Sequence, residues 1–344
     1  MDKIRESNFE LLRVVSMFFI VLYHILFFVI CKIDDSSLYK AMWLPLHVAV
    51  ICFVLISGYF HIKPSVKGMA KLFFPLLVFY LPLTIFEMIQ YGNGGIRNFF
   101  FFSKTPYWFV RTYFYLYLIA PVLNSYLSSN KRKVWLLFIL GFMSVYMGWL
   151  MHDKSMVNGK NLVLFMFLYV LGDCLRAFKD KTDQISTRYF ALLYFTLNFF
   201  LVLLFYVFSE SSLGQVIWNL SYPYCSPILI INAVLLFLII SRLHFKSRAI
   251  NWLAGSVFAV YILHHQHYVL YYWIKPLVLL AYDKITSPVI LIVSLGFISF
   301  ILLFLFILID KLFIPFQKRF LKAVSLCEDS LKKYFNNYVR ISNQ

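Results

Sequence analysis

An arginine and a histidine stand eleven residues apart in the first long apolar stretch of the chain, residues 8–30. At a rise of about 1.5 Å per residue, Arg13 and His24 would lie roughly 16 Å apart along one helix. Eleven residues make almost three full turns, so both side chains point to the same side. Because ionisable groups inside a membrane span are costly, this pair marks a candidate functional face that lines a polar passage.

These two residue types suit different parts of one reaction. A neutral imidazole can take a proton near neutral pH, so His24 suits a general base that acts on a hydroxyl group. A guanidinium is permanently charged and forms forked hydrogen bonds, so Arg13 suits a phosphate. Lys67 and Lys71, at the start of the third apolar stretch, extend this candidate anion site. An equally weighted alternative is that these two lysines only anchor the chain at the cytoplasmic face.

Further polar residues in the apolar stretches have both functional and structural interpretations. Glu10 precedes Arg13 by three residues and can pair with it on one helix face. Glu87 and Arg111, at the outer ends of neighbouring stretches, can form a structural ion pair or support a site. The other polar residues expected in two layers are Ser57 and the interfacial Asp173 and Asp310 near the inner face, and His47, His264, His265 and His267 toward the outer face.

The composition indicates a polytopic helical membrane protein. The chain has 344 residues, is 62% hydrophobic and is only 14% charged, with a mean hydropathy of +0.78. Such a chain has too little polar surface to cover a core in water, whereas its apolar runs near twenty residues match the thickness of a bilayer. We predict an all-α, multi-pass protein of the cell membrane with about ten spans at residues 9–30, 43–60, 70–90, 107–127, 134–151, 161–177, 189–209, 224–241, 252–273 and 288–310.

The positive charges predict the orientation. The net charge is +17, but the basic residues cluster between apolar stretches, which argues against nucleic acid as a partner and favours the lipid bilayer. Alternate loops hold 22 and 8 of the 32 basic residues, the smaller set including Arg97 and Lys104. This bias places both termini in the cytoplasm. Residues 1–310 form a single transmembrane domain, and residues 311–344 form a basic amphipathic tail on the inner leaflet.

The cysteines and the common motifs narrow the chemistry. The five cysteines are scattered without a C-x-x-C pair, so neither a disulfide framework nor a metal site is predicted. The chain carries no H-E-x-x-H helix, phosphate-binding loop or G-x-S-x-G elbow. The first span lacks a cleavage site and is expected to be retained. Acid–base chemistry on an activated donor, without a metal, fits these observations.

Four segments resemble the acyltransferase type three family of integral-membrane acyltransferases, which typically modify carbohydrates. The first, FELLRVVSMFFIVLYH, resembles the family's Leu-Arg followed by ten residues and a histidine. The second, FVLISGYF, resembles its F-x-x-S-G segment, and the third, YWFVRTYFYLYLIAPVLN, its Trp-Phe and Tyr-Leu-Ile-x-Pro positions. The fourth, VFAVYILHHQH, resembles its late Tyr-Leu-Ile-His motif. These segments are residues 9–24, 53–60, 107–124 and 257–267.

The resemblance implies ten membrane helices and an O-acyltransferase that moves acetyl from acetyl-coenzyme A to a hydroxyl of a cell-surface or lipid-linked glycan. By position, His24 is the catalytic base, Arg13 binds the donor and His264 supports the site. Lys67 and Lys71 stand where the family usually has arginines, so forked binding of the coenzyme's phosphates is a point of departure. The remaining positions carried over from the family are Ser57 and Gly58 for the donor side and the aromatic Trp108 and Tyr117.

Two alternatives remain open from the sequence. A transporter or flippase of a polyprenyl-linked sugar would also need polar layers on both sides of the membrane centre, with His24 as a proton relay. A membrane O-acyltransferase of the other large class pairs a histidine with an asparagine, and Asn198 and Asn232 lie in predicted spans. A homo-oligomer is compatible with either alternative, because lipid-facing and partner-facing surfaces look alike in so apolar a chain.

Overall fold

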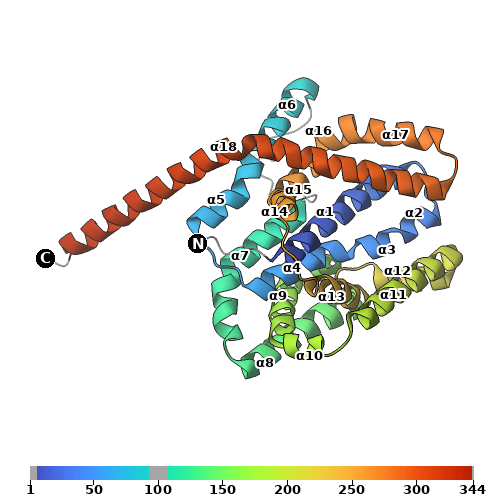
Figure 1. Ribbon diagram of the computed structural model, residues 1–344, viewed down its shortest axis with the longest axis horizontal. Coiled ribbons are helices and arrows are strands. Elements are labelled where there is room, and N and C mark those ends of the chain that lie inside the picture. Colours follow the sequence, from blue (N-terminus) through green and yellow to red (C-terminus); the bar gives the residue numbers. More distant parts are fainter. Residues whose placement is uncertain (1–5, 93–106, 343–344) are drawn as a thin grey trace.

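The computed structural model describes residues 6–92 and 107–342. These residues form helices joined by short turns, with no strand among them (Figure 1). The all-α prediction is therefore confirmed. Arg97 and Lys104, which were counted in an outer loop, lie outside the described residues.

Six helical segments in the described part of the chain are long and apolar enough to cross a membrane. They are Ser7–Lys32, Ser37–Phe60, Val66–Tyr91, Asn130–Leu150, Thr187–Phe208 and Pro288–Lys332. Each corresponds to one of the ten predicted spans. The other four predicted ranges fall on α7 (Trp108–Leu127), α9 (Leu162–Ala177), the shorter apolar α13 (Pro227–Ser241) and the group that begins with α14 (Arg248–Ala254). The protein is a multi-pass membrane protein, while the number ten and the orientation remain predictions.

Several predicted spans are not single regular helices; the range 134–151, for example, begins in a regular helix and continues as a π-helix from Phe142 to Leu150. The range 43–60 consists of α3 (Trp43–Leu46) and α4 (Val48–Phe60), which meet at His47. The range 70–90 contains a π-helical turn, η2 (Leu76–Tyr80), between α5 (Val66–Pro75) and α6 (Leu81–Tyr91). Proline lacks the backbone N–H that a regular helix needs, and Pro75 and Pro82 flank this turn.

A further interrupted range, 252–273, contains α14, α15 (Val257–His265) and α16 (His267–Val269), followed by the π-helical turn η8 (Leu270–Ile274). Helix α15 ends because Gln266 has an extended backbone, with φ −66° and ψ 131°. The Gln266 side chain then accepts a hydrogen bond from the backbone N–H of Val269, 3.1 Å away, and so caps α16. The break leaves two histidines in the last turn of a short helix.

Capping side chains mark the first residues of several remaining helices. Asn161 caps α9 by accepting a hydrogen bond from the N–H of Leu164 at 2.9 Å. Ser226 caps α13, where Pro227 occupies the first helical position. The other helices are α2 (Ser37–Ala41), α8 (Asn130–Gly141), its π-helical continuation η6 (Phe142–Leu150), α10 (Lys179–Asp183), α11 (Thr187–Phe208), α12 (Ser212–Ser221) and α17 (Lys275–Lys284).

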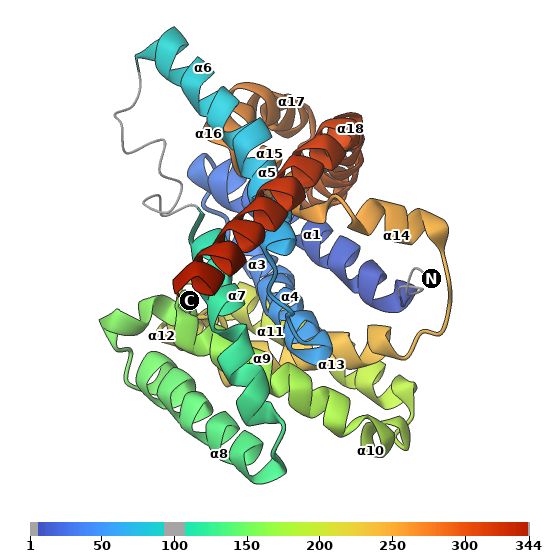
Figure 2. The same ribbon diagram turned by 90° about the vertical axis from the view of Figure 1, so that its left-hand side faces the viewer.

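Helix α1 (Ser7–Phe28) lies at the centre of the arrangement and contacts α4, α13, α14, α15 and the last helix, α18 (Pro288–Ser342) (Figure 2). Helices α6 and α8 lie at opposite edges in both views. Two hydrophobic clusters meet at α1: its C-terminal half packs with α15 and α18, and its N-terminal turns pack with α4, α9 and α13. The polar face of α1 is thus enclosed by other helices rather than by lipid.

Close backbone packing joins α4 to α9. A Cβ atom on Gly58 would lie 2.0 Å from the Tyr169 carbonyl oxygen, and one on Gly172 would lie 2.3 Å from the Leu55 carbonyl oxygen. Small residues allow such approaches between membrane helices, where packing and hydrogen bonds hold helices together. This contact fixes α4, which carries Ser57 directly before Gly58.

The last helix, α18, runs without a break from Pro288 to Ser342. Its 55 residues make it roughly 80 Å long, and its second half extends well beyond the body (Figure 1). The structure therefore marks no helix boundary at residue 311. Contact of the tail with the inner leaflet and the division into residues 1–310 and 311–344 stay predictions.

Candidate active site

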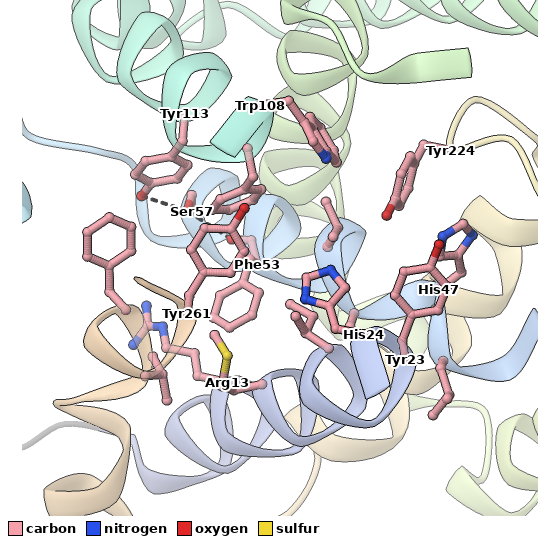
Figure 3. Close-up of a pocket in the computed structure, with 18 of the residues that line it drawn as sticks. Arg13, Tyr23, His24, His47, Phe53, Ser57, Trp108, Tyr113, Tyr224 and Tyr261 are labelled. Atoms are coloured by element: carbon pink, nitrogen blue, oxygen red, sulfur yellow. Dashed lines mark hydrogen bonds between the residues drawn. The ribbon is translucent and has the colours of Figure 1, made fainter. Parts of the chain in front are cut away.

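A cavity of about 160 Å³ lies along the predicted polar face of α1. Arg13, Met17, Ile20 and His24 line it at helical spacing, with further walls from α4, α7 and α15. Figure 3 shows the His24 ring directed into the cavity and Arg13 farther along the same helix. One cavity therefore connects the two residues that the sequence singled out.

Polar groups from three helices meet at the Arg13 end of the cavity. Arg13 forms an ion pair with Glu10 at 2.6 Å, and Glu10 is buried. Ser57 donates to the Phe53 carbonyl oxygen at 2.9 Å, so the Tyr113 hydroxyl, 3.1 Å away, donates to Ser57. The Glu10–Arg13 pair is confirmed. Arg13 retains further N–H donors for a ligand because a guanidinium carries five.

Three histidine rings meet at the other end. The Nδ1 atom of His24 lies 2.8 Å from Nε2 of His264, whose own Nδ1 lies 2.7 Å from the Val260 carbonyl oxygen. The His265 ring stacks on His24 with centroids 4.4 Å apart. His264 is almost completely buried, whereas His24 faces the cavity. The histidine cluster is therefore ordered by contacts among its own members.

Aromatic side chains form the wall beyond His24. The rings of Trp108 and Tyr224 lie 5.2 Å apart, and both residues line the cavity. His47 also lines the cavity, and its Nδ1 forms a hydrogen bond with the Tyr222 carbonyl oxygen at 3.1 Å. Tyr23 is another lining residue, and its hydroxyl forms a hydrogen bond with the Tyr222 hydroxyl at 3.0 Å. This end combines flat apolar faces with groups that can hydrogen-bond.

A lysine borders this aromatic wall. The Nζ atom of Lys160 lies 5.9 Å from the centre of the Trp108 ring, within range of a cation–π contact. Partial burial lowers the pKa of Lys160, and within the described part of the chain no carboxylate pairs with it. The preceding turn is constrained, because Val157 and Asn158 have φ of 46° and 53°. The fold thus holds an ammonium group beside the cavity.

Six of the predicted site residues gather here. Arg13, His24, Ser57 and Trp108 line the cavity, while Glu10 bonds to Arg13 and His264 bonds to His24. All six come from segments in which the sequence resembles the family. Nothing in their spacing along the chain indicates that His264 contacts His24, since the two are 240 residues apart.

The other predicted residues lie outside the cavity lining. Gly58 packs against Tyr169, as described above. The Tyr117 hydroxyl accepts a hydrogen bond from the N–H of Ser65 at 2.9 Å and so holds the turn between α4 and α5. The remaining four positions are Lys67 and Lys71, exposed on α5, Glu87, hydrogen-bonded to His267, and Arg111, half buried on α7.

Sequence reasoning did not single out Tyr113, Tyr224, Tyr261 or Lys160. The chain has 24 tyrosines, so residue type alone does not distinguish the three that line the cavity. Lys160 was counted only as a loop charge. The useful signal lay in its position, directly before a predicted span and on the predicted membrane side of the C-terminal end of the first helix.

Comparison with known proteins identifies the family. Residues 6–308 match a family model described as an acyltransferase domain. Neither the curated proteins nor the solved structures that were compared gave a match. The matched range covers most of the chain and includes every residue that lines the cavity. The chain therefore belongs to the acyltransferase type three family.

Proposed function

We propose that this protein transfers acetyl from acetyl-coenzyme A to a hydroxyl of a cell-surface or lipid-linked glycan. The observation that carries the proposal is the single cavity that holds Arg13 and His24 on one face of α1. Family membership supports acyl transfer as the reaction class. The donor, the acceptor and the role of each residue are our inference from the chemistry of the cavity.

The donor enters from the cytoplasmic end of α1 in this proposal. The guanidinium of Arg13 binds a phosphate of the coenzyme, because it keeps free donors beside its pair with Glu10. Arg13 and His24 are separated by roughly 16 Å along the helix. An extended pantetheine arm has a comparable length, so the thioester reaches His24 while the phosphates stay at Arg13.

The acceptor approaches from the opposite end. Trp108 and Tyr224 offer ring faces on which a sugar can pack, and Tyr23 and His47 offer groups that can hydrogen-bond to sugar hydroxyls. One acceptor hydroxyl then lies between His24 and the thioester carbonyl. This arrangement brings the reacting atoms together without prior transfer of acetyl to the protein.

His24 acts as general base and then as general acid. Its imidazole takes the hydroxyl proton as the hydroxyl oxygen attacks the thioester carbonyl carbon and forms a tetrahedral intermediate. The carbon–sulfur bond then breaks, and the imidazolium returns the proton to the leaving thiolate. An acetyl ester and free coenzyme A result, and His24 is neutral again. The Lys160 ammonium favours the negative charge that develops on the carbonyl oxygen.

The direct test uses membranes that contain the protein, supplied with acetyl-coenzyme A labelled in the acetyl group. We expect release of free thiol and a gain of one labelled acetyl group on a glycan, measured by mass spectrometry. His24→Ala should abolish both signals, while the matched control His244→Ala, an exposed histidine, should keep them.

Two results of this test would contradict the proposal. Transfer at the parent rate by His24→Ala would remove His24 from the mechanism. Movement of a polyprenyl-linked sugar across the membrane without thioester cleavage would favour the flippase alternative instead.

A further inference from the structure

We infer that His264 is a positioning residue, which holds His24 in the tautomer whose Nε2 lone pair faces the cavity. The inference deepens the proposed function, because it explains how His24 is ready to accept a proton. It rests on a chain of two hydrogen bonds that links α1 to α15.

The chain of hydrogen bonds begins at a group with a fixed role. The Val260 carbonyl oxygen can only accept a hydrogen bond, and Nδ1 of His264 lies 2.7 Å from it. Nδ1 of His264 must therefore carry a hydrogen. In a neutral imidazole the other nitrogen then has no hydrogen, so Nε2 of His264 is an acceptor.

The same logic assigns the hydrogen on His24. Its Nδ1 lies 2.8 Å from the accepting Nε2 of His264, so Nδ1 of His24 carries the hydrogen and donates. Nε2 of neutral His24 is left with its lone pair. In the described residues no group forms a hydrogen bond with this Nε2, and His24 lines the cavity. The lone pair is thus available to a ligand.

The opposite assignment would require a charged His264. An imidazolium donates from both nitrogens, which would force the lone pair of His24 onto Nδ1 and leave a hydrogen on the cavity side. His264 is only 1% exposed, and within the described chain no carboxylate contacts it. Burial of an unpaired charge is costly, so the neutral form is favoured.

The fold keeps both rings in these positions. His264 folds back onto the carbonyl of Val260, four residues earlier in α15, which fixes the ring relative to its own helix. His24 stacks on the neighbouring His265, with ring planes 21° apart. The arrangement resembles the logic of a catalytic triad, in which a third group orients the base and selects its tautomer.

The first measurement is the nitrogen NMR spectrum of the full-length protein, labelled with ¹⁵N in histidine and held in lipid nanodiscs. The His24 signals are assigned by their loss in His24→Ala. We expect a protonated Nδ1 and an unprotonated Nε2 for His24 in the parent. His264→Leu removes the acceptor, so His24 should become a mixture of tautomers. His264→Gln offers an acceptor oxygen at a similar reach and should restore much of the parent pattern.

A matched control separates hydrogen bonding from packing. His265→Leu removes the ring that stacks on His24 but keeps the bond to His264, so the tautomer should not change. In the transfer assay, His264→Leu should lower kcat roughly 10²-fold or more, with little change in KM. His264→Gln should recover part of this loss.

The outcomes are decisive in either direction. A hydrogen on Nε2 of His24 in the parent, or an unchanged His24 tautomer in His264→Leu, would overturn the inference. If His264→Leu does not fold, the spectra of the parent and of His264→Gln decide the question. Activity of His24→Ala would contradict the proposed function but leave the tautomer result intact, so the two failures are distinguishable.

Discussion

Two buried polar regions of this protein each hold an ionisable side chain, and they differ in how many partners surround it. Asp173 of α9 is completely buried and bonds to Lys133 at 2.6 Å, to His61 at 2.8 Å and to Arg176. His24 of α1 has a single hydrogen bond, to His264, among the described residues and otherwise faces a cavity. The first region surrounds its ionisable group with partners, and the second leaves one side open.

The difference distinguishes structural from chemical use of a polar residue. A buried charge is tolerated when its partners satisfy it, and the Asp173 network joins the ends of α4, α8 and α9 in this way. The sequence predicted Asp173 only as an interfacial residue, but the structure encloses it among three basic groups. A group with an open side retains the capacity to bind or to exchange a proton. We therefore expect mutations in the first region to change stability and mutations in the second to change rate.

The largest expected effect is loss of the base. His24→Ala should lower the transfer rate about 10³-fold or more, equal to about 4 kcal/mol in the barrier, because it removes the group that we propose takes the hydroxyl proton. The melting temperature should change little, since His24 faces the cavity. Thiol release and thermal unfolding, measured on the same preparation, test this separation. A large fall in melting temperature would assign His24 to structure, like Asp173.

Loss of Asp173 should have the reverse profile. Asp173→Ala leaves Lys133 and Arg176 without their carboxylate, which should lower the free energy of unfolding by about 3 kcal/mol or more. The rate per folded molecule should stay near that of the parent. Replacement of both Asp173 and Lys133 by leucine removes one unpaired charge and should restore part of the stability. An equal loss in the single and double variants would contradict an ion-pair origin.

The next effect concerns donor binding. Arg13→Gln removes the guanidinium that we propose binds the donor, so KM for acetyl-coenzyme A should rise roughly tenfold with a smaller change in kcat. Glu10→Gln keeps the cation and breaks only the ion pair, so it should affect KM less. Steady-state kinetics with varied donor measure both. Equal effects of the two substitutions on KM would show that donor binding depends on the Glu10–Arg13 ion pair rather than on the guanidinium alone.

The smallest effect is expected at the hydroxyl pair beside Arg13. Tyr113→Phe deletes one hydrogen bond to Ser57, worth about 1 kcal/mol, while Ser57 keeps its bond to the Phe53 carbonyl. The transfer rate should fall only a few-fold, and the melting temperature should fall slightly. A loss as large as that of His24→Ala would place Tyr113 in the chemistry itself.

Much of the site could be predicted from sequence because helical periodicity is local. The spacing of Arg13 and His24 placed both on one face, and the structure confirms that they share a cavity. The pair of Glu10 and Arg13 follows from the same rule. By contrast, Gly58 was assigned to the donor side by resemblance, and the structure places it in the packing of α4 against α9.

The long-range contacts could not be predicted, because they depend on how separate helices pack. Glu87 forms a hydrogen bond with His267, which comes from a helix far along the chain. The ion pair predicted between Glu87 and Arg111 stays a prediction. Lys160, which follows a constrained turn, lies over the ring of Trp108. Each of these contacts joins segments that are far apart in the chain, and no periodicity within either segment encodes the other.

The sequence by itself determined that this chain is an all-helical membrane protein with one polar face on its first helix. Apolar run length, charge bias and 3.6-residue periodicity suffice for that, since each depends on neighbours in the chain. Only the tertiary structure decided which residues and which cavity lie against this face. The end of α15 at His265 brings His264 within 2.8 Å of His24, and the packing of several helices around α1 leaves a cavity between His24 and Arg13. The reason is physical: a hydrogen bond between residues 240 positions apart exists only once the helices that carry them are packed.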